Sequence, residues 1–411
     1  MCIRVRPTVY ANRPTGASEL TAHHVGFVGA GQLARMAGEA ASALGLSMAV
    51  LAERPDDAAC EVAAEVVLGS PLVAAELRDF AARCRVVTFD HEQVDLSVVE
   101  AVAEEGAVFR PGPATLEMAV DKAHMRTVLD GAGVPSPHYA VVDPASAGAH
   151  AAVADFGAAH GWPLVVKAAR GGYDGKGVWP VRDQAEAETV LAVIGGRAVL
   201  EELLPLEAEL AVMVARRPAG DSVAWPAVET AQLDGVCREV LVPGRLPAEV
   251  LAEASALGRR VADIAGAVGV MAVELFWSGG RLLVNEVATR PHNSGHWTIE
   301  GSVTSQFENH LRAVLDLPLG STALAHPAVA SVNLFGGAGG EDPVALLPQG
   351  LGVAGAHVHL YGKSPRPGRK LGHVTVCGGP DDDVRGRAWS AARALGTPVP
   401  EGLALPAPVS P

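Results

Sequence analysis

The chain has 411 residues, of which 49% are hydrophobic and 19% charged, and this composition excludes a disordered or coiled-coil protein. Its 46 acidic residues outnumber its 32 Lys and Arg residues, so the formal net charge is −14. Because phosphate binding is mainly electrostatic, this excess of acid argues against a general affinity for nucleic acid or an anionic membrane surface. The length predicts two or three domains, each able to bury its own core.

Cysteine use and the two ends of the chain indicate the compartment. The cysteines are Cys2, Cys60, Cys84, Cys237 and Cys377. Their scattered positions without CxxC spacing predict neither a disulfide framework nor a zinc site, and they favour the reducing cytoplasm. No apolar run reaches the roughly 18 residues of a membrane span. Residues 1–22 lack the apolar stretch of a secretory signal and are predicted to be a disordered leader, with a misplaced start codon or an Arg-rich organellar presequence as alternatives. Residues 396–411 are predicted to be a loose Pro-rich tail.

A glycine turn lies between a strand and a helix near the start of the chain. VGFVGAG (25–31) is typical of an apolar strand that runs into glycines, QLARMAGEAASALG (32–45) of a helix, and further strands are expected at 47–53 and 85–90. This order predicts a βαβ unit and hence a parallel sheet. The turn could bind the pyrophosphate of NAD, with Glu53 on the ribose, or another phosphate, or it could be a plain turn.

The middle of the chain is predicted to contain a second unit after a Pro- and Gly-rich boundary. One helix is expected over roughly 114–130, followed by a small α/β unit over 138–210 with strands at 162–169, 178–181 and 198–204 and a helix over about 184–194. Strands dominate from 209 to 320, with helices near 249–268 and 303–315. A last segment over about 325–395 begins with the strand-like AVASVNLFGG.

Lys167 ends a buried strand and precedes the glycine-rich stretch GGYDGKG (171–177). Four glycines between two strands predict a flap whose main-chain amides can close over phosphates. The stretch lacks the GKS or GKT of a P-loop. A lysine at a buried strand end needs an anion. The alternative is a flexible hairpin whose lysine reaches solvent.

Two glutamates lie on the two neighbouring strands of a predicted hairpin. VGVMAVELFW (268–277) and RLLVNEVA (281–288) are expected to be strands joined by 278–280. A three-residue loop places Glu274 opposite Val284 and Glu286 diagonal to it on one apolar face, with Cβ atoms roughly 7–8 Å apart. Like charges on such a face require a cation, and oxygen ligands including Asn285 suit Mg²⁺. A two-residue turn would place the glutamates on opposite faces, and a solvated face is the alternative.

Two further segments carry anion donors. Residues 289–297 (TRPHNSGHW) follow the second glutamate strand directly, and their Arg, His and Asn side chains suit a carboxylate or carbonate-like group. Tyr361-Gly362-Lys363 and RPGRKLGH (366–373) form a basic patch in an acidic chain. This patch is either a surface loop or a clamp for a phosphate.

Five segments together resemble the N5-carboxyaminoimidazole ribonucleotide synthetases, which are ATP-grasp carboxylases of purine biosynthesis. The segments are GAGQLARM (29–36), KAARGGYDGKG (167–177), VMAVELF (270–276), LLVNEVATRPHNSGHWT (282–298) and RPGRKLGHVTV (366–376). The resemblance implies an α/β and α+β multidomain protein with an ATP-grasp fold. It implies a Rossmann-like pre-ATP-grasp domain over 23–117, an ATP-grasp domain over 118–322 with a lid subdomain at about 138–206, and a β-rich C-terminal domain over 323–395.

The same resemblance implies the ligands and their residues. The substrates are ATP, bicarbonate and 5-aminoimidazole ribonucleotide, with Mg²⁺ and without biotin, in a cytoplasmic homodimer. The implied ATP-binding residues are Lys122, Lys167, Gly172, Tyr173, Asp174, Gly175, Lys176, Gly177, Val178, Glu201, Glu202, Leu203, Leu204, Glu209, Gln232, Asn285 and Glu286. The implied Mg²⁺ ligands are Glu274 and Glu286. The implied catalytic residues are Arg290, His292, Asn293, Lys167 and Tyr173. The implied ribonucleotide contacts are Gln32, Leu33, Glu92, Asp174, Lys363 and Arg369.

The chain departs from the family pattern at two places. Thr230 and Gln232 stand where an Asn-x-His pattern is usual, and TFDHE (88–92) stands where the family has Thr-Tyr-Glu-x-Glu. Three other functions stay open: a related ATP-grasp ligase such as the formate-dependent glycinamide ribonucleotide transformylase, an NAD-dependent oxidoreductase built on residues 25–53, and an inactive ATP-binding regulator.

Overall fold

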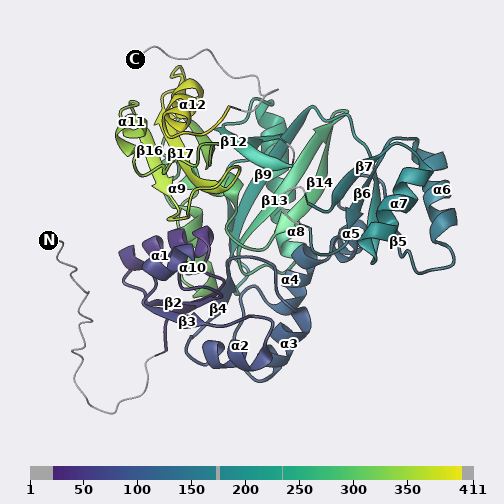
Figure 1. Ribbon diagram of the computed structural model, residues 1–411, viewed down its shortest axis with the longest axis horizontal. Helices are drawn as coiled ribbons and strands as arrows, with labels where there is room; N and C mark the ends of the chain where they lie inside the picture. The colour runs from purple at the N-terminus through teal and green to yellow at the C-terminus, as the bar shows by residue number, and fades with distance from the viewer. Residues whose placement is uncertain (1–21, 173–175, 234, 400–411) are drawn as a thin grey trace.

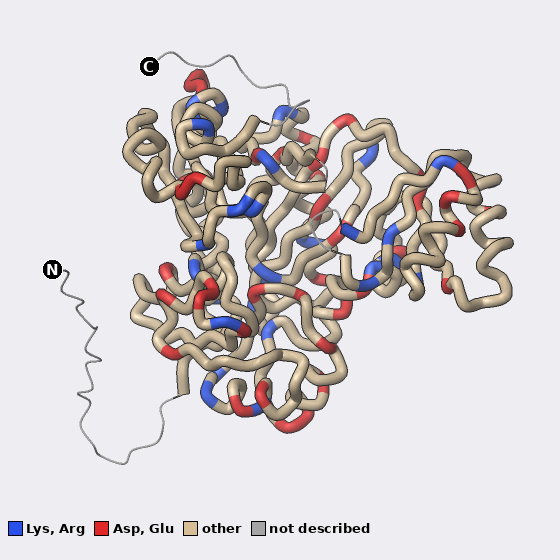
Figure 2. Tube along the Cα trace, viewed as in Figure 1, with Lys and Arg blue, Asp and Glu red and all other residues tan. Residues whose placement is uncertain are grey.

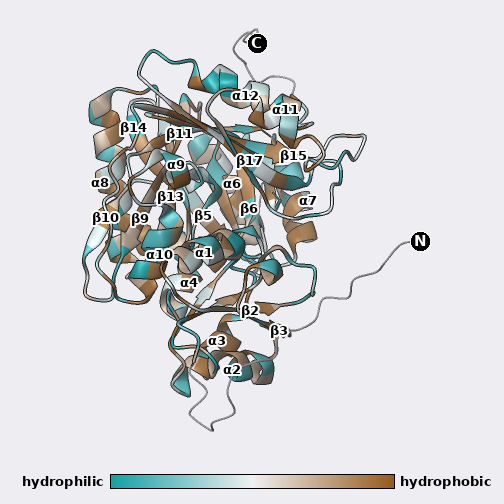
Figure 3. Ribbon diagram, turned by 90° about the vertical axis from the view of Figure 1, so that its left-hand side faces the viewer, coloured by the Kyte–Doolittle hydropathy of each residue, from teal (hydrophilic) through white to brown (hydrophobic). Residues whose placement is uncertain are grey.

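The computed structural model describes residues 22–172, 176–233 and 235–399. The predicted leader therefore lies almost wholly outside the described residues, as does most of the predicted tail. The described residues form three sheets with helices packed against them (Figure 1). No helix among the described residues is long and apolar enough to cross a membrane. Hydrophobic stretches, brown in Figure 3, lie in the strands and in the helices that cover them.

The N-terminal domain is the predicted parallel sheet, in the order β3-β2-β1-β4. Its strands are β1 (Val25–Val28), β2 (Met48–Ala52), β3 (Glu65–Leu68) and β4 (Val87–Phe89). Its helices are α1 (Gln32–Ala43), η1 (Ala58–Glu61), α2 (Ala74–Ala81) and α3 (Leu96–Glu104). The βαβ prediction is confirmed, with β1 ending before the glycine turn, where Gly29 has a φ of +90°. Such a φ favours glycine because a side chain would be strained there.

The single helix expected over 114–130 is wrong. Two helices, α4 (Pro113–Val120) and α5 (Lys122–Gly131), are separated by Asp121, whose backbone is extended with φ −125° and ψ 102°. The Asp121 carboxylate accepts hydrogen bonds from the first free N–H groups of α5, which makes it an N-cap. Asp at an N-cap competes with the helical path of the preceding turn, and the hydrophobic pattern alone did not reveal this break.

A small antiparallel sheet forms the lid subdomain, in the order β5-β8-β6-β7. Its strands are β5 (Tyr139–Val142), β6 (Leu164–Ala168), β7 (Val178–Val181) and β8 (Ala198–Glu202), and its helices are α6 (Ala149–His160) and α7 (Gln184–Ile194). The helix predicted over 184–194 is confirmed. This subdomain extends away from the rest of the molecule on the right of Figure 1.

The remaining strands form one antiparallel sheet, in the order β14-β13-β9-β11-β12-β15-β17-β16, with β10 paired to β9. Its strands are β9 (Ala208–Arg216), β10 (Ser222–Ala224), β11 (Val228–Leu233), β12 (Val236–Val242), β13 (Gly269–Ser278), β14 (Arg281–Ala288), β15 (Ala328–Phe335), β16 (Ala356–Leu360) and β17 (Lys370–Gly378). Its helices are α8 (Ala248–Ile264), η2 (Asn293–Gly295), α9 (Thr298–Gly301), α10 (Gln306–Val314), α11 (Leu347–Leu351) and α12 (Val384–Ala394). The C-terminal strands therefore continue the central sheet through the β12–β15 pairing.

Helix α10 joins the N-terminal domain to this central sheet. Phe307, Leu311 and Val314 pack in one core with residues of α1, β1 and β2. His310 adds polar links, since its Nε2 lies 2.9 Å from Thr88 Oγ1 and its Nδ1 accepts from the main-chain N–H of Val270 at 3.0 Å. The glycine turn, the hairpin β13–β14 and the segment after it are thereby held at one junction.

Candidate active site

The two predicted metal carboxylates face each other directly, which corrects the diagonal placement. Ser278 pairs with Arg281, so the turn has only two residues, Gly279 and Gly280, both with positive φ. By itself this turn would put the glutamates on opposite faces. A bulge restores the match, because Glu274 pairs with Glu286 while Leu275 pairs with Val284, leaving Asn285 as the extra residue. Directly paired residues point to the same face of a sheet.

Two lysines from different elements meet this pair. Lys122 Nζ at the start of α5 lies 2.5 Å from Glu286 Oε2. Lys167 Nζ at the end of β6 donates to Asn285 Oδ1 at 2.9 Å and to Glu201 Oε2 at 2.7 Å. The β14 bulge and the lid sheet are thus joined through charged side chains. Acidic and basic positions alternate where the lid meets the central sheet (Figure 2).

Burial and mutual repulsion set the protonation of the three acids on this face. Glu209 lies on β9, two residues from the partner of Glu274, so it points the same way. Burial, together with Glu286, raises the pKa of Glu209 to about 7. Burial, followed by repulsion from Glu286, raises the pKa of Glu274 to about 8. Burial opposes ionisation of Glu286 too, but Lys122 outweighs it and holds the pKa of Glu286 below its usual value. This face of the sheet therefore holds three carboxyl groups, and the charge of Lys122 neutralises one of them, Glu286.

Lys167 forms a buried ion pair with Glu201. Arg126, which also contacts Glu201, was not predicted from the sequence as part of the site. Glu201, 2% exposed, accepts from Arg126 Nε at 2.8 Å as well as from Lys167. Arg126 also donates to the main-chain oxygen of Val284 at 2.7 Å. The available signal for Arg126 was its place four residues after Lys122, on the same helix face. The Glu201 side chain is therefore occupied by two cations, and the contact of residues 201–204 with a nucleotide base stays a prediction.

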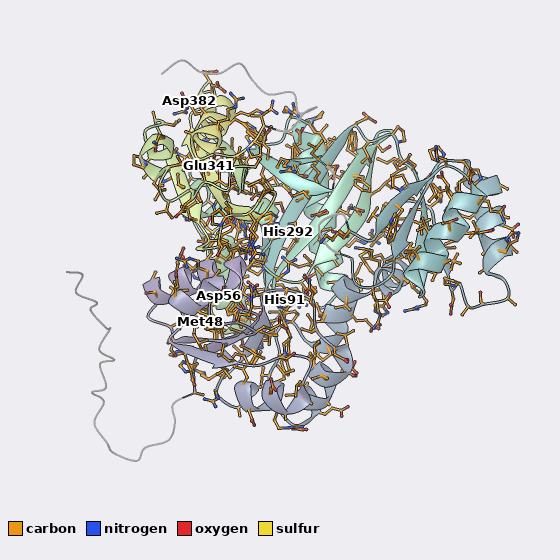
Figure 4. The ribbon with its side chains drawn as sticks, in the orientation of Figure 1. Met48, Asp56, His91, His292, Glu341 and Asp382 are labelled. Atoms are coloured by element: carbon orange, nitrogen blue, oxygen red, sulfur yellow. The ribbon has the colours of Figure 1, made fainter. Side chains whose placement is uncertain are left out.

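The segment after β14 brings Arg290, His292 and Asn293 to the junction. Arg290 Nε donates to Glu92 Oε2 at 2.7 Å. His292 Nε2 lies 3.4 Å from Glu274 Oε1, and burial, followed by repulsion from Arg290, lowers the pKa of His292 to about 3. Asn293 Oδ1 is buried without a hydrogen-bond partner among the described residues. Figure 4 shows His292 where the central sheet, the C-terminal strands and the N-terminal domain meet.

Gln306 orients this segment. Its Oε1 accepts from the main-chain N–H of His292 at 2.9 Å, and its Nε2 donates to the main-chain oxygen of His292 at 2.8 Å. A Cβ on Gly295 would lie 2.4 Å from Gln306 Oε1, so glycine is required for the close approach. Sequence reasoning missed Gln306, because a glutamine at the start of a helix carries no signal of its own.

The basic patch lies against the glycine turn of the N-terminal domain. Lys363 Nζ lies 2.5 Å from Gln32 Oε1, which joins two residues far apart in sequence. Arg369 donates to the main-chain oxygen of Ser364 at 3.0 Å. The Leu33 side chain is buried in the core, so a ligand contact there would come from its main chain. Of the two alternatives for the patch, this packing favours the clamp.

The start of α1 is already occupied by a carboxylate. Asp90 Oδ2 accepts from the N–H of Gly31 at 3.0 Å, and Oδ1 accepts from Ala34 at 2.7 Å. A pyrophosphate placed there would meet this carboxylate, which argues against the NAD alternative. Asp90 is one of the departures from the family pattern. At the other, the Gln232 side chain acts on Glu274 and opposes the rise of its pKa.

The glycine-rich stretch is described only at its edges. Tyr173, Asp174 and Gly175 lie outside the described residues. Gly172 and Gly177 approach closely, since a Cβ on Gly177 would lie 3.2 Å from Gly172 Cα, and Gly177 has a φ of +82°. Val178 begins β7, where it pairs with Lys167.

Three family models match successive parts of the chain. They are the ribonucleotide synthetase preATP-grasp domain at residues 22–120, the ATP-grasp domain at 127–307, and the phosphoribosylaminoimidazole carboxylase C-terminal domain at 329–387. Among curated proteins, the N5-carboxyaminoimidazole ribonucleotide synthase of Mycobacterium tuberculosis is 44% identical over 398 residues, covering 94% of this chain and 91% of that protein. The Synechococcus elongatus protein of the same name is 42% identical, with 86% and 89% covered.

Solved structures agree with these matches. The N5-carboxyaminoimidazole ribonucleotide synthetase of Thermus thermophilus is 37% identical with a TM-score of 0.79, covering 90% of this chain and 97% of that one. The Aspergillus clavatus enzyme in complex with ADP and 5-aminoimidazole ribonucleotide is 29% identical with a TM-score of 0.83, covering 92% and 99%.

Proposed function

Because this chain belongs to the N5-carboxyaminoimidazole ribonucleotide synthase family, we infer that it is an ATP-grasp ligase of purine biosynthesis. It uses ATP and bicarbonate to carboxylate the exocyclic amine of 5-aminoimidazole ribonucleotide, releasing ADP and phosphate. The observation that carries this assignment is the convergence of two lysines on the Glu274–Glu286 pair, with residues 290–293 directly beyond it.

The ATP phosphates would lie between Lys122 and Lys167. Both ammonium groups now contact oxygens of the β14 bulge, so phosphate oxygens would extend these contacts. Fixed cations are most effective where negative charge moves during phosphoryl transfer, since they need not reorganise at that moment. The glycine-rich stretch that the resemblance places over the phosphates, with Gly172, Lys176, Gly177 and Val178, remains a prediction.

We propose that Glu274 and Glu286, with Asn285 beside them, hold Mg²⁺. The donor set fits, because Mg²⁺ is usually bound by one or two carboxylates together with phosphate oxygens and water. Burial, followed by repulsion from Glu286, raises the pKa of Glu274, and a cation between the two carboxylates would favour its ionised form. In the part of the chain that the structure describes, no group of three or more His, Cys, Asp or Glu side chains is arranged as a metal site. When bound, the ion would offset charge on the transferring phosphoryl group.

Bicarbonate would be held by Arg290, His292 and Asn293. A bicarbonate oxygen attacks the γ-phosphorus of ATP, and the bond to the β–γ bridging oxygen breaks, giving carboxyphosphate and ADP. Arg290 offers a planar pair of donors for the carbonate group. His292 is kept neutral by burial, so one ring nitrogen accepts a hydrogen bond while the other donates. The unpartnered Asn293 Oδ1 can accept from the bicarbonate hydroxyl or from the attacking amine.

The ribonucleotide would lie between the N-terminal domain and the basic patch. Lys363, Arg369 and Gln32 are proposed to hold its phosphate and ribose, and Glu92 to link it to Arg290. Its amine then attacks the carbonyl carbon of carboxyphosphate, or CO₂ released from it, and phosphate leaves.

ADP release from ATP, Mg²⁺ and bicarbonate, measured with and without 5-aminoimidazole ribonucleotide, tests the assignment. We expect strong stimulation by the ribonucleotide, a requirement for bicarbonate and loss of activity with a chelator. Stimulation by formate and glycinamide ribonucleotide instead would assign the chain to the related transformylase. Absence of ATP turnover under every condition would favour the inactive regulator.

Oligomeric state and compartment are proposed on the family alone. We propose a cytoplasmic homodimer, since the resemblance implies a dimer and the co-substrate is ATP. Light scattering after size-exclusion chromatography would return twice the 42.2 kDa chain mass if the dimer forms.

A further inference from the structure

Asp121, between α4 and α5, has a completely buried side chain that makes four hydrogen bonds. Oδ1 accepts from the main-chain N–H groups of Ala123 and His124, both at 3.0 Å. Oδ2 accepts from Arg170 Nε at 2.8 Å and from Arg197 at 2.5 Å. An N-cap requires only the first two contacts. The two arginine contacts therefore need a separate explanation.

Both arginines lie at strand ends of the lid sheet. Arg170 follows the end of β6 by two residues, and Arg197 immediately precedes β8. The main chain reinforces the link, since Lys122 N donates to Ala169 O at 2.8 Å and Ala169 N donates to Arg197 O at 3.0 Å. One carboxylate thus ties two neighbouring strands of the lid to the first turn of α5.

The tied elements carry the phosphate-binding cations. Lys167 lies on β6, three residues before Arg170, and Lys122 directly follows Asp121. Lys122 reaches Glu286 and Lys167 reaches Asn285, so both ammonium groups converge on the β14 bulge. A shift of the lid strands against α5 would change the spacing between the two cations.

We propose that Asp121 is a positioning residue for ATP, which holds β6 and β8 against α5 so that Lys122 and Lys167 keep one spacing. This proposal rests on the proposed function, because it assumes that both lysines bind the phosphates. The guanidinium groups are about half exposed, at 54% and 50%, whereas the carboxylate is not exposed at all. Asp121 is therefore the buried member of the cluster, and its carboxylate depends on the two arginines for half of its hydrogen bonds.

The test is Asp121→Asn, which keeps an oxygen for the helix cap and removes the charge that the arginines need. We expect the KM for ATP to rise about tenfold, since charge-assisted hydrogen bonds are the strong ones and 1.4 kcal/mol is one factor of ten. The KM for the ribonucleotide should stay unchanged. Asp183→Asn is the matched control, because Asp183 caps α7 of the lid subdomain by accepting from Glu186 N at 2.9 Å.

Binding of a non-hydrolysable ATP analogue, measured by calorimetry, separates positioning from chemistry. Asp121→Asn should weaken analogue binding by the same factor, whereas Asp183→Asn should leave it unchanged. Arg170→Gln and Arg197→Gln should each raise the KM for ATP, and combining them with Asp121→Asn should add little. A lower melting temperature with unchanged KM and unchanged analogue binding would overturn the proposal.

If Asp121→Asn does not fold, Arg170→Gln and Arg197→Gln test the proposal instead. An unchanged KM for ATP in both of these variants would overturn the proposal. Failure of the proposed function is distinguishable, because the wild-type chain would then show no ribonucleotide-stimulated ADP release. The comparison of analogue binding between the variants and the wild-type chain does not depend on ribonucleotide-stimulated ADP release.

Discussion

Replacing Glu201 by glutamine removes the one negative charge between two buried cations. The Glu201 side chain is 3% exposed and contacts Arg126 and Lys167, which are 1% and 10% exposed. Burial opposes ionisation of Glu201, but Lys167 and Arg126 outweigh it and hold the pKa of this carboxyl below its usual value. The substitution keeps the shape of the side chain and removes the carboxylate that both cations contact directly.

Breaking a buried ion pair from one side destabilises a protein by roughly 3–5 kcal/mol. Glutamine still accepts one hydrogen bond, so we expect the lower bound, about 3 kcal/mol. At about 2–4 °C per kcal/mol for a domain of this size, the melting temperature should fall by roughly 6–12 °C. Thermal unfolding followed by circular dichroism measures this fall, and hydrogen exchange of β6 and β8 should show that the loosening is local.

Glu202→Gln is the matched control on the same strand. The Glu202 carboxylate accepts a hydrogen bond from the main-chain N–H of His138 at 2.9 Å, at an exposed position. Because water can replace this hydrogen bond, Glu202→Gln should lower the free energy of unfolding by less than about 1 kcal/mol. Adding Arg126→Met to Glu201→Gln should cost less than the sum of the two single changes, since the unpaired guanidinium is gone. Equal melting temperatures for Glu201→Gln and Glu202→Gln would refute the reasoning.

Three further predictions concern the other parts of the site. Lys363→Ala should raise the KM for the ribonucleotide about tenfold or more with little change in the KM for ATP, in steady-state assays. Gly31→Ala places a Cβ 2.2 Å from Asp90 Oδ2, which would displace this carboxylate from the N–H groups at the start of α1. Loss of these hydrogen bonds should lower the free energy of unfolding by roughly 1–3 kcal/mol, as measured by thermal unfolding. Burial lowers the pKa of His359, but the Glu300 carboxylate 2.6 Å away outweighs it and raises that pKa. The stabilisation is therefore complete below the ordinary histidine value of about 6.5 and lost as the pH rises through the higher folded value, so Glu300→Gln should flatten the fall in melting temperature as the pH rises above about 6.5.

The helices and strands with a regular spacing of apolar residues, or with turn-forming residues at their ends, could be predicted from the sequence. The βαβ unit, the helix over 184–194 and the hairpin over 268–288 were all predictable, because alternating apolar residues and flanking glycines act within a few residues. The strand β3 was not predicted, since only alternate residues of Glu65–Leu68 are even partly buried. The break at Asp121 was missed because the hydrophobic pattern continues across it, and that pattern does not show that the Asp121 carboxylate caps α5.

The carboxylate pair shows how a correct juxtaposition can be predicted from an incorrect turn geometry. Both glutamates were predicted to share a face, but from a three-residue turn that does not form. The turn has two residues, and the bulge at Asn285 restores the common face. A bulge is stabilised by what its extra residue contacts, here Lys167 from another subdomain, so hairpin length alone could not reveal it.

The sequence by itself determined the family, the order of the domains and the residue types of the site, because motifs and periodicity are properties of neighbouring residues. Only the tertiary structure decided which charges meet: Asp90 on the start of α1, Glu92 on Arg290, and Lys363 on Gln32. These partners lie from 59 to 331 residues apart in the chain. Their pairing follows from how the sheets pack, and packing depends on the whole core rather than on any local pattern.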